Sequence, residues 1–278
     1  MTLSFDPAGD ARLLRGISLG LLQDRADPSA QDDAPPIPEP PDWRFEPYVA
    51  GWLPLKLKGD VTMRGTVTNV NVDLDTLISD LDWVIEGGFQ LTNDQWSIVT
   101  FGFWGKLETE SKTSGPLGER DTTLSLEEAL LDVALLYRIG EWPLGNSETA
   151  TWGFDLGPGL RYWHVDVEVD TKGALGIDPD LSRVDDWVDP LVNGRLNFHF
   201  SEKFEGWVRA DVGGFGIGSA SDLTYSFSAM GAFKLSPNVS LLAGYRYMNL
   251  DWSSGSGADK AAYDYYFHGP IFGLSITF

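Results

Sequence analysis

The feature that most constrains this chain is a two-residue alternation of apolar and polar side chains, which recurs from Trp43 to the last residue. Successive side chains of a β-strand point to opposite faces, so this period predicts strands rather than helices. The stretch "EEALLDVALLYRI" shows it well, because Leu131, Val133 and Leu135 alternate with Glu128 and Asp132. The pattern occurs in ten segments: 43–59, 82–91, 97–108, 127–139, 151–163, 188–200, 204–216, 223–235, 239–252 and 269–278.

The segments and their connections have the proportions of a transmembrane β-barrel. A tilted strand needs about 9–11 residues to cross a bilayer, and each segment is long enough. Short connections, such as 92–94, 201–203 and 236–238, alternate with longer ones around 59–80, 109–122, 168–184 and 251–262. Short turns at one end and long loops at the other are typical of an outer-membrane barrel. We therefore predict an all-β, antiparallel, up-and-down barrel of about ten strands. In the first long loop, "DTLISDLD" has a spacing that allows one or two helical turns.

The two faces of the strands differ sharply in chemistry. One face is almost purely apolar, with aromatic residues near the segment ends, as a membrane interface favours. The other carries arginine, aspartate and glycine in mid-strand, which suits a narrow, filled lumen. The alternative is a soluble β-sandwich or lipocalin-like barrel with its apolar face inward, but that fold does not explain the alternating loop lengths.

Composition excludes several other classes. The sequence has no cysteine, so it has neither a disulfide framework nor a thiolate metal site. It has no apolar run of about 18 residues, which excludes a transmembrane helix. The net charge of −21 argues against a nucleic-acid partner, because phosphates would be repelled.

Residues 1–42 differ from the rest of the chain. The short apolar run from Ile17 to Leu22 is interrupted by glycine and lacks a clear cleavage site, so it is a weak match to a secretory signal. The stretch "DDAPPIPEPPD" is proline-rich and acidic, as extended linkers are. We predict a disordered or leader-like arm over 1–42 and a barrel over 43–278.

Three stretches carry a family resemblance: "WVDPLVNGRLNFHFSEKFEGWVRADVGGFGIGS", "LLAGYRYMNLDW" and "YYFHGPIFGLSITF". They resemble the outer-membrane β-barrel proteins of Gram-negative bacteria, in the broad opacity-protein and outer membrane protein A-like group. The resemblance covers about residues 43–278 and concerns architecture rather than an activity. It implies an outer-membrane location with both termini in the periplasm, and contact with lipid and lipopolysaccharide. It also implies that the barrel-assembly machinery reads the terminal Phe278 as an assembly signal.

One group of side chains near a strand end has the residue types of a reactive or cation-binding site. His164, Asp166, Glu168 and Asp170 share one parity, so their side chains project the same way. A histidine with acidic neighbours can activate water, which makes His164 and Asp166 candidate catalytic residues. Carboxylates at a rim can equally hold calcium, and Asp166, Glu168, Asp170, Asp185 and Asp186 are the candidate ligands. The third interpretation is a solvated acidic loop with neither role.

Charged residues on the inward face predict an ion-pair network inside the barrel. A charge in a narrow lumen needs a partner, because a buried charge without one is costly. The network either fills and rigidifies the barrel or lines a selective polar conduit. Its predicted members are Glu46, Glu86, Asp132, Arg138, Asp155, Arg161, Asp189, Arg195, Arg209, Asp211 and Arg246.

These observations leave three functional hypotheses. The first is a monomeric, non-catalytic barrel with a structural or surface-interaction role and no cofactor other than calcium at the acidic loops. The second is a small solute pore. The third is a membrane-embedded hydrolase with His164 and Asp166 at its rim.

Overall fold

The computed structural model describes residues 42–73, 81–115, 118–146, 149–173 and 181–278. All described residues belong to one compact unit, Pro41–Phe278. Apart from Asp42, the predicted N-terminal arm lies outside the described residues. So does most of the predicted helical stretch, and β4 begins directly after it at Leu81.

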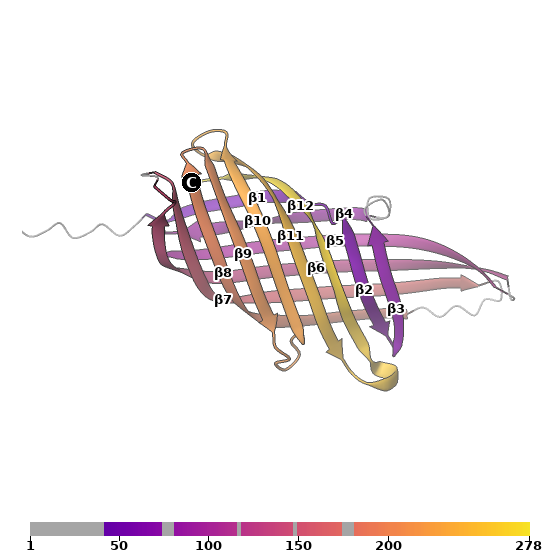
Figure 1. Cartoon of the computed structure of the whole chain (residues 1–278). Helices are drawn as coiled ribbons and strands as arrows, with labels where there is room; N and C mark the ends of the chain where they lie inside the picture. The colour runs from indigo at the N-terminus through magenta and orange to yellow at the C-terminus, as the bar shows by residue number, and fades with distance from the viewer. Residues whose placement is uncertain (1–41, 74–80, 116–117, 147–148, 174–180) are drawn as a thin grey trace, which may run out of the picture. The chain divides into compact units, whose positions relative to one another are not determined.

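Within the described residues the fold is a closed antiparallel barrel of ten strands, β1 and β4–β12 (Figure 1). Each strand pairs with the next along the chain, and β12 pairs with β1 to close the ring. The predicted fold class and strand number are confirmed. The strands are β1 (Arg44–Trp52), β4 (Leu81–Thr92), β5 (Trp96–Gly115), β6 (Gly118–Pro143), β7 (Thr151–Gly173), β8 (Leu181–Ser201), β9 (Phe204–Gly214), β10 (Leu223–Lys234), β11 (Val239–Ser254) and β12 (Ala261–Ile276).

A hairpin of two further strands, β2 (Lys56–Met63) and β3 (Thr66–Asp73), extends the sheet beyond β12. The path from β1 to β2 is interrupted at Pro54, which has no N–H to donate. Leu53 N and Leu55 N on either side still donate to Pro270 O and His268 O of β12, at 3.0 and 2.8 Å. The first predicted segment, 43–59, therefore runs along β12 with one break. Most of the connection predicted over 59–80 is strand.

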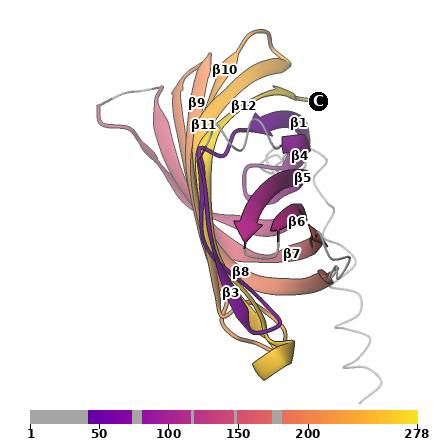
Figure 2. The same cartoon turned by 90° about the vertical axis from the view of Figure 1, so that its right-hand side faces the viewer.

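The barrel has a turn end and a loop end. The turn end holds the short connections 93–95, 202–203 and 235–238 together with the C-terminus. At the loop end β5–β8 continue well past the ring (Figures 1 and 2). The predicted loops over 109–122 and 168–184 are thus largely paired strands, with Glu110 opposite Thr123 and Glu168 opposite Ser182. These extensions are mostly polar on both faces, and hairpin pairing satisfies the backbone in water as well as in lipid.

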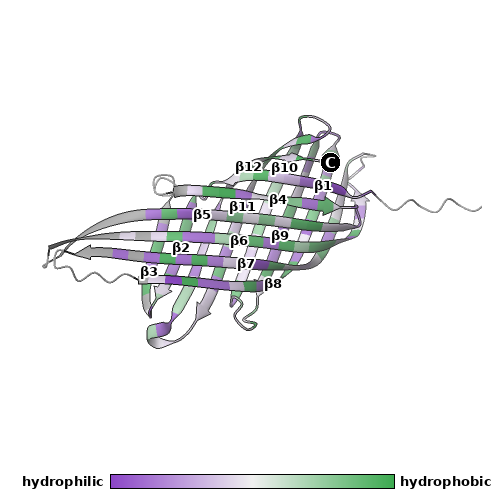
Figure 3. Cartoon of the chain, turned by 180° about the vertical axis from the view of Figure 1, so that it is seen from behind, coloured by the Kyte–Doolittle hydropathy of each residue, from purple (hydrophilic) through white to green (hydrophobic). Residues whose placement is uncertain are grey.

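The face predicted to be apolar points outward on every strand of the ring. Figure 3 shows hydrophobic and hydrophilic residues alternating along the strands. On β6, Leu131, Val133 and Leu135 are 47, 40 and 43% exposed, whereas the intervening Leu130, Ala134 and Leu136 are buried. Aromatic side chains border this apolar band at both ends, as interfacial girdles do. Those of the turn end are Phe45, Phe89, Trp96, Tyr137, Trp142, Trp152, Phe198, Phe200, Phe204 and Phe278. Those of the loop end are Trp83, Trp104, Tyr162, Tyr225, Tyr247 and Tyr266.

The middle and the loop-end half of the interior are filled by side chains, in line with the small size of the ring. Its middle is polar, and its loop-end half holds an apolar cluster that includes Trp52, Trp163, Trp187, Trp252 and Phe267. Among the described residues we find no helix long and apolar enough to cross a membrane. One short 3-10 helix, η1 (Gly257–Asp259), lies in the connection between β11 and β12.

Candidate functional site: the barrel lumen

The centre of the lumen is an arginine held between two aspartates. Arg161 of β7 is 0% exposed. Its Nε and Nη2 donate to Asp132 Oδ1 and Oδ2 of β6 at 2.7 and 2.9 Å, and Nη2 also donates to Asp211 Oδ1 of β9 at 2.9 Å. Nη1 donates to Thr224 Oγ1 at 3.0 Å. These bonds join β6, β7, β9 and β10 across the barrel, so they brace the ring as well as neutralise the charges.

A second network lies nearer the turn end, centred on Asp155 of β7. Arg195 Nη2 and Asn197 Nδ2 donate to Asp155 Oδ2 at 2.8 and 2.7 Å. Arg138 Nε donates to Asp155 Oδ1, and Arg138 Nη1 reaches Glu141 Oε2 at 2.8 Å. Arg195 also donates to Gln90 Oε1 at 2.6 Å and to Ser97 Oγ at 3.2 Å, which ties β8 to β4 and β5.

The structure therefore joins six of the predicted lumen charges, Asp132, Arg138, Asp155, Arg161, Arg195 and Asp211, into ion pairs. The others face inward but have different surroundings. Asp189 accepts from Trp163 Nε1 at 2.9 Å and from Ser221 N at 2.7 Å, not from an arginine.

Arg209 donates to the neutral Asn193 Oδ1. The Asn193 side chain has room next to β7 because it faces Gly159. A Cβ at that position would lie 2.6 Å from Asn193 Nδ2, too close for any larger residue. Glu46, Glu86 and Arg246 line a cavity, and within the described residues none of the three is in an ion pair.

Aromatic rings close the lumen on the loop-end side of Arg161. Trp187 of β8 stacks on Trp252 of β11 with centroids 4.5 Å apart, and Trp252 stacks on Tyr263 of β12 at 5.3 Å. Trp163 stacks on the other side of Trp187 at 5.9 Å. Tyr263 donates its hydroxyl hydrogen to Asp185 Oδ2 at 2.8 Å, which connects opposite walls. Sequence parity alone places these tryptophans on the inward face, but their stacking across the lumen depends on which strands face one another.

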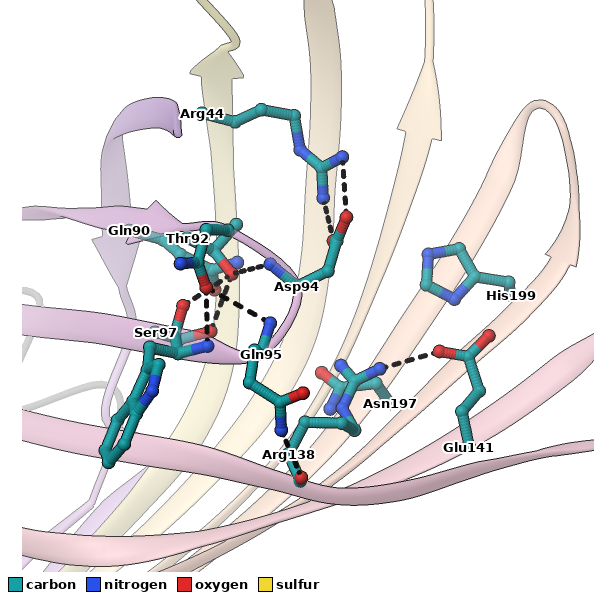
Figure 4. A network of polar contacts seen from close by, with 12 residues as sticks. Arg44, Gln90, Thr92, Asp94, Gln95, Ser97, Arg138, Glu141, Asn197 and His199 are labelled. Carbon is teal, nitrogen blue, oxygen red and sulfur yellow. Dashed lines mark hydrogen bonds and ion pairs between the residues drawn. The ribbon is translucent and has the colours of Figure 1, made fainter. Parts of the chain in front are cut away.

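The turn-end half of the lumen contains a cavity of about 530 Å³. Ionic and polar side chains surround its mouth, where Arg44 pairs with Asp94 and Arg138 with Glu141 (Figure 4). Deeper in, it is lined by Tyr48, Glu86, Arg195, Arg209 and Arg246, with Val99, Phe101, Leu242 and Ile271 as apolar wall. The cavity thus opens at the turn end, the Asp155 network forms part of its wall, and the Arg161 network and the aromatic stack lie beyond it.

The predicted rim site has a different geometry from the one that the sequence indicates. His164 Nδ1 lies 2.8 Å from Asp186 Oδ1, which also accepts from the Tyr162 hydroxyl. Asp166 Oδ1 has no hydrogen-bond partner in the described part of the chain. The hydrogen bonds from Tyr162 and His164 hold the pKa of Asp186 below its usual value. This histidine–aspartate pair lies on the outer surface of the barrel, not in the lumen.

The candidate calcium ligands are not brought together. Asp185 and Asp186 lie within β8 rather than in a loop, and neighbouring residues of a strand face opposite ways. Asp185 points inward, where it binds Arg183 and Tyr263, whereas Asp186 points outward with Asp166 and Glu168. In the described ranges, no group of three or more acidic or histidine side chains is placed to hold a metal ion.

Phe278 lies outward in the turn-end girdle and is 72% exposed. Its N donates to Phe45 O at 2.9 Å, Phe45 N donates back to Phe278 O at 3.3 Å, and the two rings are 6.3 Å apart. The last residue of the chain therefore pairs with β1 where the ring closes.

Solved structures similar to this chain include several outer-membrane barrels. No protein-family model and no curated protein sequence matches the chain. The outer-membrane protease OmpT of Escherichia coli matches with a TM-score of 0.47 and 14% identity, over 86% of this chain and 97% of that one. The translocator domain of the autotransporter NalP of Neisseria meningitidis matches with a TM-score of 0.38 and 12% identity, over 97% of this chain and 96% of that domain. Ail of Yersinia pestis matches with a TM-score of 0.30 and 11% identity, over 85% of this chain and 98% of Ail.

These scores are low, so the assignment to the outer-membrane barrel type depends on the ring of ten strands, the exposed apolar band and its aromatic girdles.

Proposed function

We propose that this barrel is a non-catalytic outer-membrane protein with a closed lumen, serving a structural or surface-interaction role. One observation carries the proposal: the middle of the barrel is filled across its width. Arg161, Asp189 and Asn193 are each 0% exposed, and Trp163 beside them is also 0% exposed. A conducting pore needs a continuous wet path, and larger barrels obtain it by leaving the interior open.

The alternative is a small solute pore, and electrical conductance separates the two. The protein reconstituted into planar bilayers should give no stepwise current. Protease protection of the membrane-spanning strands in the same bilayers shows that the barrel has inserted, so that an absence of current reports a closed lumen. Stepwise currents of uniform size from the unaltered protein would overturn the closed-lumen proposal.

We propose no catalytic role for the rim. The three histidines lie on separate elements: His164 pairs with Asp186, His199 lies 4.0 Å from Glu205 and His268 contacts Tyr245. His164 faces away from the lumen, so a substrate held inside the barrel does not reach it. Incubation with a mixture of unstructured peptides should give no cleavage, whereas cleavage that is lost in His164→Ala would establish the hydrolase.

We further propose a monomer surrounded by lipid, with lipopolysaccharide on the loop-end side. All ten strands of the ring contribute exposed apolar side chains, so the band has no polar gap to be covered by a second subunit. In this orientation both ends of the barrel domain are periplasmic. The barrel-assembly machinery is the proposed partner during biogenesis, and a protease added to intact cells should cut only at the loop end.

A further inference from the structure

The unusual group in this lumen is Arg246 of β11. It is 8% exposed, and its Nε and Nη1 are buried without a hydrogen-bond partner in the described part of the chain. Its guanidinium carbon lies 3.4 Å from the ring centroid of Phe101 and 5.8 Å from that of Trp52. Stacking holds the guanidinium plane in place but supplies no acceptor for its N–H groups.

A buried arginine in this state is costly unless something neutralises it. Guanidinium stays charged in proteins, and its five donors need acceptors once water is excluded. The other lumen arginines have them, since Arg161 bonds two aspartates and Arg195 bonds Asp155. The opposite charge that acts most strongly on Arg246 is Glu86, but the two form no ion pair, and Glu86 Oε2 also lacks a partner.

Arg246 lines the inner end of the turn-end cavity, and a second cation lies there with it. Arg209 Nε and Nη2 share one neutral acceptor, Asn193 Oδ1, at 3.3 and 2.7 Å, so its charge is not balanced by that contact. Nearer the mouth the cations are already paired, Arg44 with Asp94 and Lys234 with Glu205. Glu86 and Asp132 partly offset these charges, but the unpartnered N–H donors of Arg246 lie at the closed inner end, where screening by solvent is weakest.

The wall beside Arg246 is apolar, and Val99, Phe101, Leu242 and Ile271 line the cavity there. The volume of about 530 Å³ lies within the usual range for small-molecule sites. We propose that this cavity binds a small carboxylate with an apolar body, which enters from the turn end. Its carboxylate accepts hydrogen bonds from Arg246 and Arg209, and its body packs on Phe101 and the neighbouring aliphatic side chains.

Benzoate is a suitable probe, with benzyl alcohol as its neutral counterpart of the same size. Titration calorimetry of the full-length protein in detergent should show one benzoate bound per chain and no saturable binding of benzyl alcohol. Inorganic phosphate should bind more weakly than benzoate, because it cannot use the apolar wall. Phosphate binding as tight as that of benzoate would contradict the apolar part of the proposal.

Substitutions of Arg246 test whether this residue holds the benzoate carboxylate. Arg246→Met keeps an unbranched apolar stem but removes the guanidinium, and should weaken benzoate binding by about ten- to hundredfold, the loss expected for charge-assisted hydrogen bonds. Arg183→Met, which removes an arginine at the loop end, should leave the affinity unchanged. If Arg246→Met does not fold, Arg246→Lys keeps the charge but not the fork of donors, and should retain a weakened site.

Benzoate binding that is unaffected by both Arg246 variants would overturn the inference, as would its absence from the unaltered protein. The inference is separate from the closed-lumen proposal, because calorimetry reports the cavity and bilayer currents report the blocked centre.

Discussion

At the scale of single residues, some charged side chains in the lumen form ion pairs and others do not. Arg161 lies between Asp132 and Asp211, and removing it would leave two buried carboxylates facing each other. We expect Arg161→Met to lower the free energy of unfolding by about 3–5 kcal/mol. Urea unfolding of the protein in lipid bilayers measures this.

The matched comparison is Arg44→Met, which removes a solvent-exposed pair with Asp94 at the cavity mouth. Exposed pairs contribute about 0–1 kcal/mol, so this variant should unfold nearly as the unaltered protein does. Equal losses in the two variants would show that the central network is not desolvated.

A second residue-scale prediction concerns pH. Asp251 lies at the loop end beyond the tyrosine girdle, and burial, Asp264 and Asp222 raise its pKa above the usual value. A carboxyl whose pKa is raised by folding contributes stability at low pH, and this contribution is lost as the pH rises through the raised pKa. Asp251→Asn removes the repulsion, so it should raise the melting temperature at pH 7 and leave it unchanged near pH 3, below the usual pKa of aspartate, about 3.9.

Asp259→Asn is the control for Asp251→Asn, because it also removes one negative charge, but from the exposed helix η1. A higher melting temperature in Asp259→Asn as well would point to the net charge of the protein rather than to the Asp251–Asp264 contact.

At the scale of the strand, position along the barrel should set the effect of an outward-facing charge. Val133 is 40% exposed in the middle of the apolar band, whereas Val184 is 53% exposed beyond the loop-end girdle. Val133→Arg should cost about 2–4 kcal/mol in bilayers and Val184→Arg about 0–1 kcal/mol. The two substitutions should become similar in cost if the barrel does not span the membrane at the band.

The last strand makes a prediction about assembly. The exposed Phe278 faces lipid, which fills the space left by a smaller side chain, so Phe278→Ala should refold in detergent with little change in stability. In cells the same variant should reach the outer membrane poorly if the assembly machinery reads this residue. Surface labelling with an export signal attached measures the level, and normal surface levels would show that Phe278 is only another lipid-facing residue.

Strand periodicity predicts most of this fold because membrane and lumen impose opposite chemistry on alternate residues. Leu131 and Asp132 lie on opposite faces in the structure, as their parity indicates. The strand ends were not predictable in the same way, because Thr109–Gly115 carries no apolar alternation and yet remains paired with β6. Outside the membrane a hairpin extension needs only backbone partners, and these leave little trace in the sequence.

Parity also identifies which charges face inward, but not which of them meet. Arg161 reaches Asp211 two strands away, and Arg195 reaches Gln90 across the lumen. Asp189 has the same parity as Arg195 yet bonds Trp163 and Ser221. Contacts of this kind depend on strand tilt and on the depth of each residue, which local patterns do not encode. The unpaired Arg246 is the clearest example, since its sequence context resembles that of the paired arginines.

At the scale of the whole molecule, an apolar outer surface surrounds a turn-end cavity and the proposed closed centre. Because the sequence contains no cysteine, single cysteines can be introduced along β6 and labelled without background reaction. Nitroxide labels at Leu131, Val133 and Leu135 report the outer face, and labels at Leu130 and Ala134 report the lumen.

The most direct test is the accessibility of these labels in bilayers to oxygen, which dissolves in lipid, and to a water-soluble nickel chelate. We predict a period of two, with the outward labels accessible to oxygen and the inward labels accessible to neither reagent. Inward labels that collide freely with the nickel chelate would contradict the closed lumen, and outward labels that do so would contradict the membrane-spanning barrel itself.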